Sequence, residues 1–281
     1  MIGISFKRLG ALCLKPVRNA PIIHSSKVNF FQTSTVTVKD KDDPADLPSN
    51  VTLIFELEGM LLNTTDTLSR SMRILLKDEG INAPIERVSD PSIVGESFKE
   101  FVQNVFKIQI DTAKVFKTGK FLAQQTKRLE EIFLEMSKAD KAITIQPVIH
   151  ETLQLLAEEG HLMVLCTNLP QTVTNHLLER FGLRRYFAVV VGGDLIPVCK
   201  PDPGHLLYAV ECSGREISGA LMIGSSVVDI KAAKAAAIPI IAIPRDEMMK
   251  NAMIRFHPES VIENVTAIPD AMEQLMRNSM Y

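Results

Sequence analysis

Short apolar runs alternate with segments of helical spacing through most of the second half of the chain. The runs are almost wholly aliphatic, which is typical of strands buried on both faces of a parallel sheet. We expect strands at 51–55, 162–166, 188–191, 221–223, 238–243 and 261–262. We expect helices at 148–159, 171–181, 203–212, 227–237 and 269–278. This alternation predicts an α/β fold with a doubly wound, Rossmann-like parallel sheet.

The segment between the first and second expected strands has a different pattern. Apolar residues recur at helical spacing from 66 to 77 and again through 84–140, and no strand-like run interrupts them. Gly80 is expected to end the first of these helices. Because 51–55 must join the sheet across this segment, the helices form an insertion. We therefore predict an α/β core made of 51–65 and 145–281, and an all-helical cap domain at 66–144.

The charge is distributed unevenly along the 281 residues. The chain as a whole carries -2, but residues 1–39 hold six Lys and Arg and no acid, so the remainder carries -8. A basic, acid-free start predicts a mitochondrial transit peptide at 1–39, followed by a linker at 40–50 and a matrix location. A plain basic tail is the alternative. The acidic body gives no sign of nucleic-acid binding, and no apolar run reaches the ~18 residues of a membrane span.

Polar residues that suit phosphate chemistry follow several of the expected strands. They are Glu56, Thr167 with Asn168, Lys200, and Ser225 after Gly224. Ligands of open α/β sheets bind beyond the carboxyl ends of the strands, so these residues are expected to converge. Lysine, hydroxyl and backbone N–H groups bind phosphate, whereas carboxylates hold Mg²⁺ or attack phosphorus. The sequence alone also allows Thr167 to cap a helix, or Lys200 to pair with Asp229 or Glu56 for structure only.

Four segments carry a resemblance to a known family. They read FELEGM at 55–60, LCTN at 165–168, KPDP at 200–203 and MIGSSVVD at 222–229. In order and spacing they resemble the haloacid dehalogenase (HAD)-like hydrolases, in the phosphoglycolate phosphatase-like branch. Segments 79–84 and 93–95 fall where cap motifs of that branch fall.

The resemblance implies a role for each matching residue. Glu56 and Glu58 stand where the family has its nucleophilic and its acid/base aspartate. Thr167, Asn168 and Lys200 match the phosphate-binding positions. Glu56, Glu58 and Asp229 would be the Mg²⁺ ligands.

Three departures weaken the implied activity. Glutamate replaces both aspartates, Met60 replaces the usual threonine, and Ser225 replaces an expected aspartate ligand. The extra methylene moves a carboxylate by about 1 Å, and a misplacement of ~1 Å can cost on the order of a hundredfold in rate. Serine is also a poor Mg²⁺ ligand compared with a carboxylate.

We therefore expect a pseudo-phosphatase that needs no cofactor and acts as a binding or structural subunit of a larger mitochondrial assembly, such as the ribosome. One alternative is a Mg²⁺-dependent phosphatase with Glu56 as its nucleophile. A second is a sensor that binds a phosphorylated metabolite through Thr167, Asn168 and Lys200.

Overall fold

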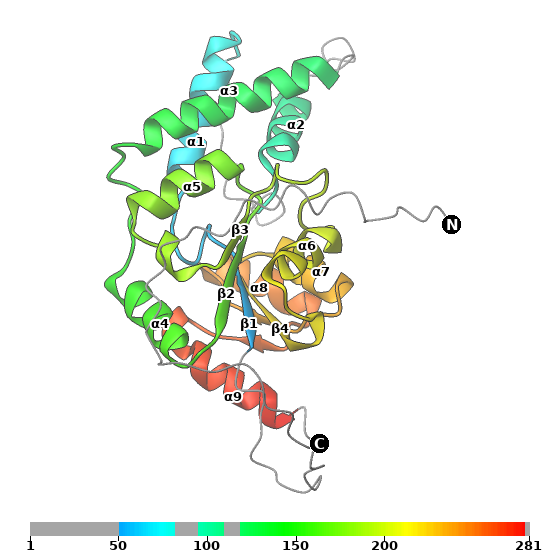
Figure 1. Ribbon diagram of the computed structural model, residues 1–281. Helices are drawn as coiled ribbons and strands as arrows, with labels where there is room; N and C mark the ends of the chain where they lie inside the picture. Colours follow the sequence, from blue (N-terminus) through cyan, green and yellow to red (C-terminus); the bar gives the residue numbers. More distant parts are fainter. Residues whose placement is uncertain (1–50, 82–94, 110–118, 279–281) are drawn as a thin grey trace, which may run out of the picture. The chain divides into compact units, whose positions relative to one another are not determined.

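A six-stranded parallel sheet forms the centre of the computed structural model, which describes residues 51–81, 95–109 and 119–278 (Figure 1). The strands are β1 (Thr52–Phe55), β2 (Leu162–Cys166), β3 (Val189–Val191), β4 (Ala220–Gly224), β5 (Ile240–Ala242) and β6 (Ser260–Val261). Their order is β3-β2-β1-β4-β5-β6. The first of the described strands thus lies in the middle, where Phe55 pairs with Leu165 on one side and Ile223 on the other.

Helices cover both faces of this sheet. They are α4 (Pro147–Glu158), α5 (Gln171–Arg180), α6 (Pro203–Ser213), α7 (Val227–Ala235), α8 (Glu247–Met253) and α9 (Ile268–Asn278). Short 3₁₀ turns lie at Arg184–Tyr186, Ile217–Gly219, Ile254–Phe256 and Val265–Ala267.

The two faces of β1 show how the layers are assembled. Successive side chains of a strand point to opposite faces. Leu53 and Phe55 pack into the cluster that contains residues of α4, α5 and α9, whereas Ile54 packs into the cluster of α6, α7 and α8. Both faces are apolar and fully buried, so the continuous apolar pattern of 51–55 is explained. The expected doubly wound α/β fold is confirmed.

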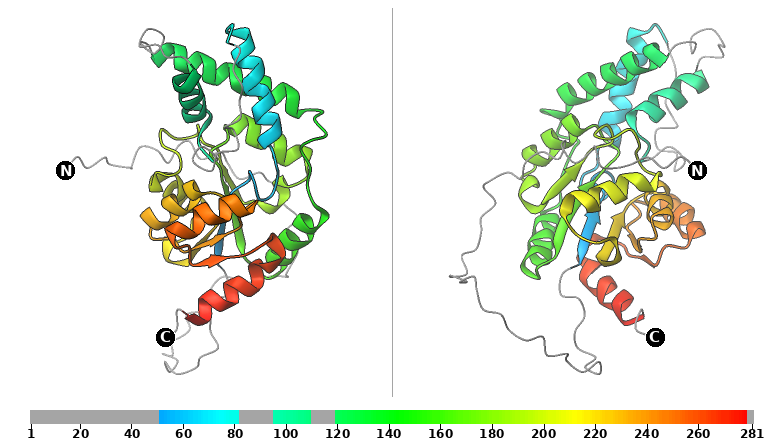
Figure 2. Two further views of the ribbon diagram at one scale, coloured as in Figure 1. Left: turned by 180° about the vertical axis from the view of Figure 1, so that it is seen from behind. Right: turned by 45° about the vertical axis from the view of Figure 1, so that its right-hand side comes forward.

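In the described part of the segment between β1 and α4, the inserted helices are α1 (Thr65–Asp78), α2 (Phe98–Gln109) and α3 (Gly119–Ser137). Figure 2 shows them grouped together at one end of the sheet. Their interior is apolar, with Phe98 and Phe133 in edge-to-face contact at 5.6 Å between ring centroids. Gly80, at φ +72°, follows the end of α1 as expected. The transit peptide, the linker and most of the two cap motifs lie outside the described residues.

Arg180 of the core binds the segment that leads from the inserted helices back to the sheet. Arg180, at the end of α5, donates to the carbonyl oxygens of Ser137 and Asp140, the latter at 2.7 Å. The Asp140 carboxylate in turn accepts hydrogen bonds from Thr67 and Arg70 of α1. Burial opposes ionisation of Asp140, but the Ala142 N–H, Thr67 and Arg70 outweigh it and lower its pKa. This cluster fixes where α1 and α3 meet α5.

None of the helices in the described ranges is both long and apolar enough to cross a membrane.

Candidate functional site

Four polar side chains meet at the carboxyl ends of the central strands. Glu56 follows β1, Thr167 follows β2, Lys200 lies in the loop after β3, and Asp229 lies in the first turn of α7. All four are buried, and Lys200 and Asp229 are 0% exposed. Buried charges are tolerated only when they are paired and hydrogen-bonded, so the partners of each group define the site.

Both carboxylate oxygens of Glu56 have partners. Oε1 accepts hydrogen bonds from the N–H of Leu57 at 2.7 Å, the N–H of Glu58 at 3.2 Å and the Thr167 hydroxyl at 2.5 Å. Oε2 accepts from the Lys200 ammonium. Burial raises the pKa of Glu56, and the nearby positive charge of Lys200 offsets only part of that effect. The side chain is therefore fully engaged inside the protein.

Lys200 is the cation at the centre of the site. Its Nζ donates to Glu56, to Asp229 Oδ1 at 2.6 Å and to the Cys166 carbonyl at 2.8 Å. Burial by itself would lower the pKa of the ammonium group. The charges of Asp229 and Glu56 outweigh burial and hold that pKa above its ordinary value. Lys200 therefore stays charged at physiological pH, with each of its three protons donated to an oxygen.

Asp229 also caps the helix that contains it. Its Oδ2 accepts from the backbone N–H of Ser225 and Ser226, both at 3.0 Å, and from the Ser226 hydroxyl at 2.8 Å. Ser226 and Asp229 form the capping box that begins α7. Gly224 allows this approach, because a Cβ there would lie 2.5 Å from the Cβ of Asp229.

Asn168 and His205 hold the Lys200 loop in place. The Asn168 amide donates to the carbonyl oxygens of Lys200 at 2.7 Å and of Gly95, next to α2, at 2.6 Å. His205 accepts from the Lys200 N–H at 3.3 Å and contacts the Gly192 carbonyl at 3.2 Å. Burial and the charge of Lys200 lower the pKa of His205 to about 3. The imidazole is therefore neutral.

His205 is a residue of the site that the sequence did not reveal. The available signal was its position three residues after Asp202, which caps α6. A side chain there leans back over the start of its helix, towards the loop that carries Lys200.

The Glu58 carboxylate has Thr64 as its hydrogen-bond partner. Its Oε1 accepts this hydrogen bond, of 2.7 Å, and the backbone carbonyl oxygen of Glu58 accepts one of 2.6 Å from the Ser225 hydroxyl. Burial raises the pKa of Glu58, and the Thr64 hydrogen bond opposes that shift. Gly59, at φ +81°, packs against Ser225, since a Cβ there would lie 3.0 Å from its Oγ. The loops after β1 and β4 are thereby joined directly.

The predicted Mg²⁺ ligands do not fit the ion in this arrangement. Glu56 binds Lys200 and Thr167, Glu58 binds Thr64, and Asp229 binds Lys200 and the start of α7. Mg²⁺ requires near-octahedral oxygen ligands. Within the described ranges, no group of three or more His, Cys, Asp or Glu side chains is placed to hold a metal.

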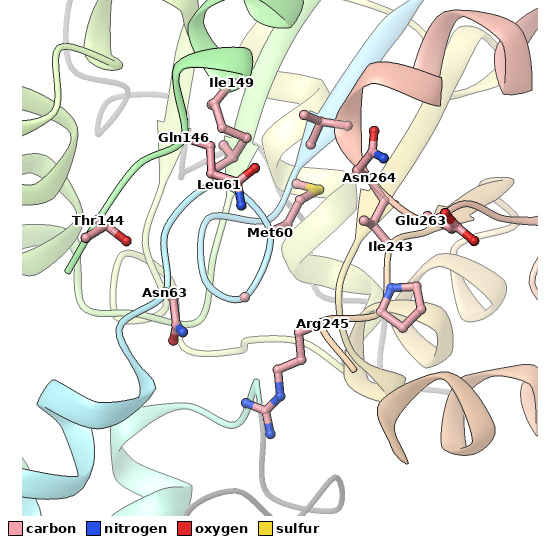
Figure 3. Close-up of a pocket in the computed structure, with 13 residues that line it drawn as sticks. Met60, Leu61, Asn63, Thr144, Gln146, Ile149, Ile243, Arg245, Glu263 and Asn264 are labelled. Atoms are coloured by element: carbon pink, nitrogen blue, oxygen red, sulfur yellow. The ribbon is translucent and has the colours of Figure 1, made fainter. Parts of the chain in front are cut away.

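Two cavities lie beside these residues, and as far as the described residues line them, neither is bordered by Glu56. The larger, of about 740 Å³, lies between α2, α3 and the loops after β2 and β3, and it reaches Asn168. The smaller, of about 320 Å³, is shown in Figure 3. Met60 and Leu61 line it beside Gln146, Arg245 and Asn264.

Comparison with known proteins identifies the family of the chain. The sequence model of the haloacid dehalogenase-like hydrolases matches residues 53–243, well over half of the chain. The chain belongs to the haloacid dehalogenase-like hydrolase family. The match spans β1 to β5 and includes every HAD-like site residue described above.

Several relatives are phosphoglycolate phosphatases. The enzyme of Agrobacterium fabrum is 28% identical over 227 residues, which cover 80% of this chain and 93% of the relative. That of Pseudomonas fluorescens is 31% identical over 202 residues, 71% of each chain. A crystal structure of a predicted phosphoglycolate phosphatase from Haemophilus somnus superposes with a TM-score of 0.68 at 20% identity, over 81% of this chain and 100% of the other. This last likeness shows the HAD fold.

The structure brings together Glu56, Thr167, Lys200 and Asp229 as expected, with Asn168 next to them, while the Glu58 carboxylate binds Thr64. The alternative role of Thr167 as a helix cap is wrong, because Pro170 is the capping position of α5 and Thr167 donates to Glu56. The expected structural pairing of Lys200 is present with both Glu56 and Asp229. The catalytic, phosphate-binding and metal-binding roles of these residues stay predictions.

Proposed function

We propose that this HAD-like protein does not turn over phosphoesters efficiently and acts as a binding or structural subunit. The observation that carries the proposal is the set of four hydrogen bonds on the Glu56 carboxylate. A nucleophile must approach phosphorus to about 3–3.5 Å and in line. Glu56 would first have to leave two backbone N–H groups, Thr167 and Lys200. This costs four hydrogen bonds, three of them buried and one of these to the charged Lys200.

Two further contacts support the proposal. A proton donor must lie within hydrogen-bond reach of the leaving group, whereas the Glu58 carboxylate is held by Thr64 beside α1. The family's additional acid is replaced by Ser225, whose hydroxyl is used on the Glu58 carbonyl. Both changes act on the same reacting centre.

We place this subunit in the mitochondrial matrix, within a larger assembly such as the mitochondrial ribosome. The six basic residues and the lack of acids in 1–39 support the location. The test fuses residues 1–50 to a fluorescent protein and fractionates mitochondria under mild conditions. Matrix import and sedimentation of the full-length protein with a large particle are expected. A cytosolic fusion, or a free monomer, would contradict this part of the proposal.

A second candidate is a Mg²⁺-dependent phosphatase for small phosphorylated organic acids. It is favoured by the phosphoglycolate phosphatases that match this chain over most of their length. In this case Glu56 attacks phosphorus, and Glu58 protonates the leaving group and then activates water. A phosphorylated small molecule would then be the ligand.

Turnover by the purified protein separates the two candidates. Release of phosphate from 2-phosphoglycolate and p-nitrophenyl phosphate is measured with Mg²⁺ for wild type, for Glu56→Ala and for a control, Glu211→Ala, on an exposed part of α6. We expect all three to match the enzyme-free rate. Wild-type turnover that survives in Glu211→Ala and disappears in Glu56→Ala would establish the phosphatase. Turnover by Glu56→Asp/Glu58→Asp/Ser225→Asp alone would identify the residues at 56, 58 and 225 as the cause of inactivity.

A further inference from the structure

The smaller cavity, of about 320 Å³, lies where the inserted helices join the core (Figure 3). Both connections between the two parts line it, with Asn63 between β1 and α1 and Gln146 between α3 and α4. The loops after β5 and β6 complete its walls. Its volume is in the range of small-molecule sites, which begins at roughly 300 Å³. The described lining does not include Glu56, Thr167 or Lys200, so this cavity is separate from the site around Lys200.

The inner wall of the smaller cavity is apolar. Four aliphatic side chains of the lining are buried: Leu61, Ile149, Ile243 and Val265. Met60 is half-buried, and in Figure 3 it lies between Gln146 and Ile243. A methionine thioether packs favourably against aromatic rings. This wall therefore suits a ligand with a flat, apolar face.

The rim of the cavity offers more hydrogen-bond donors than acceptors. Asn63 Oδ1 accepts from the N–H of Thr65 at 3.2 Å, and Asn264 Oδ1 accepts from the N–H of Thr266 at 3.0 Å. The amide oxygens are thus used within the chain, and each NH₂ group brings two donors to the rim. Gln146 is exposed and its side chain makes no capping hydrogen bond, so its amide offers both a donor and an acceptor. A ligand that matches this rim has several acceptors and at least one donor.

The charges of the described lining cancel, because it holds one cation, Arg245, and one acid, Glu263. The Arg245 guanidinium already donates to the Thr65 hydroxyl at 3.2 Å and pairs with Asp246 at 3.2 Å. Glu263 is exposed, and Figure 3 shows it across the cavity from Asn63. An uncharged ligand therefore fits this lining better than an anion or a cation.

We propose that the smaller cavity binds an uncharged purine base, free or within a nucleoside, and that the bound base bridges the two connections between core and inserted helices. A purine presents a flat face to Met60 and ring nitrogens that accept hydrogen bonds from Asn63 and Asn264. Adenine also pairs a ring acceptor with an amino donor, the edge that Asn and Gln amides bind with two hydrogen bonds in nucleic acids. Gln146 supplies such an amide. The inference is independent of the proposed function, because it uses none of the residues around Glu56.

Adenine binding to the full-length protein, measured by isothermal titration calorimetry, tests the proposal. For a ligand of about ten non-hydrogen atoms we expect a dissociation constant on the order of 0.1–1 mM, at one site. Indole has a similar shape and lacks the ring acceptors, so it should bind at least about tenfold more weakly. Equal binding of indole and adenine overturns the proposal, as does the lack of saturable adenine binding up to about 5 mM.

A substitution tests where the base binds. Gln146→Ala removes one partner of the base while the backbone cap of α4 remains, so the variant should fold normally and bind adenine about tenfold more weakly. The matched control is Gln154→Ala, on an exposed face of the same helix, which should bind as wild type does. Equal adenine affinity in the two variants would place the base elsewhere and overturn the proposal.

Proteolysis tests the bridge between the two connections. Saturating adenine should slow cleavage between residues 137 and 146 at least about twofold in wild type, because the bound base opposes local opening. An unchanged cleavage rate overturns the bridging role. Adenosine identifies the source of the base: binding at least as tight as that of adenine assigns the site to a nucleoside, and weaker binding assigns it to the free base. Phosphatase turnover enters none of these readouts, so a failure here and a failure of the proposed function are distinguishable.

Discussion

The Ser225 hydroxyl lies 2.6 Å from the carbonyl oxygen of Glu58 and donates a hydrogen bond to it. Donor therefore faces acceptor at the point where the loops after β1 and β4 meet. An aspartate at 225 would place one acceptor against another, and a cation between them would be needed to relieve the repulsion. Serine makes this contact stable on its own, which explains how the loops stay together around the Gly59 turn.

Replacing Ser225 by alanine should destabilise the fold. The substitution leaves the Glu58 carbonyl without this buried partner, and we expect a loss of about 1–3 kcal/mol in the free energy of unfolding. Urea denaturation measures the loss. Ser213→Ala is the matched control, because Ser213 also donates to a carbonyl but near the surface at the end of α6. An equal loss of unfolding free energy in the two variants would show that the Ser225 hydrogen bond stabilises the fold no more than the one near the surface.

Lys200→Met should be the most damaging of the single changes. It leaves Glu56 and Asp229 buried without their shared cation, and removal of one partner from a buried ion pair costs roughly 3–5 kcal/mol. The pKa of Glu56, already raised by burial, then rises further. A raised folded-state pKa favours the fold at lower pH, so the deficit should shrink as the pH falls towards the ordinary glutamate value of 4.5. Exposed Lys141→Met is the control; a deficit independent of pH would contradict the assigned charges.

His205 should make stability depend on pH. Its folded-state pKa of about 3 lies below the ordinary value of 6.5. As the pH drops below 6.5, His205 therefore binds a proton in the unfolded chain and not in the folded protein. The free energy of unfolding falls as a result. The loss attributable to this residue is about 1 kcal/mol between pH 6.5 and 5.5.

Urea denaturation across this range checks the effect of His205. His205→Gln should be less stable at neutral pH and should show a shallower loss on acidification. The control is His257→Asn, at an exposed position with φ +50° that asparagine tolerates. If the unfolding free energy of His205→Gln falls with decreasing pH as steeply as that of wild type, another group is responsible for the pH dependence.

Arg180→Ala should loosen the junction between α5 and the inserted helices. The variant loses charged hydrogen bonds to the carbonyl oxygens of Ser137 and Asp140. Such bonds contribute roughly 1.5–3 kcal/mol each when buried, and less in this partly exposed position. We expect a drop of at least about 1 kcal/mol in unfolding free energy and faster proteolytic cleavage between residues 137 and 146. Arg215→Ala, on an exposed loop, should stay within ~0.5 kcal/mol of wild type.

The sheet could be predicted from the sequence because its strands are buried on both faces. A continuous aliphatic run such as 162–166 has few alternatives when turn residues bound it, and the observed strand is Leu162–Cys166. The helix expected from 227 likewise begins at Val227. The short helix α8 was missed, because seven residues hold too few turns to establish a period. There Met249 and Met253 are buried and Met248 is half exposed.

The site was predictable in its membership and not in its contacts. Convergence of Glu56, Thr167 and Lys200 follows from their positions after parallel strands. Which oxygen receives which hydrogen depends on rotamers, and several decisive partners are backbone groups that every residue has. The Leu57 N–H on Glu56 and the Glu58 carbonyl on Ser225 are of this kind. No pattern of residue types distinguishes such partners from other backbone groups.

The place of β1 has a consequence for biogenesis. Of the strands in the described residues this one is translated first, yet its two neighbours begin only at Leu162 and Ala220. At roughly 5–20 residues per second, a nascent chain would leave it without a pairing partner for on the order of ten seconds. During that interval its apolar side chains and open edges are available to other chains. A chaperone that binds Leu53–Phe55 should therefore matter most early in synthesis, before the residues around Lys200 have been translated.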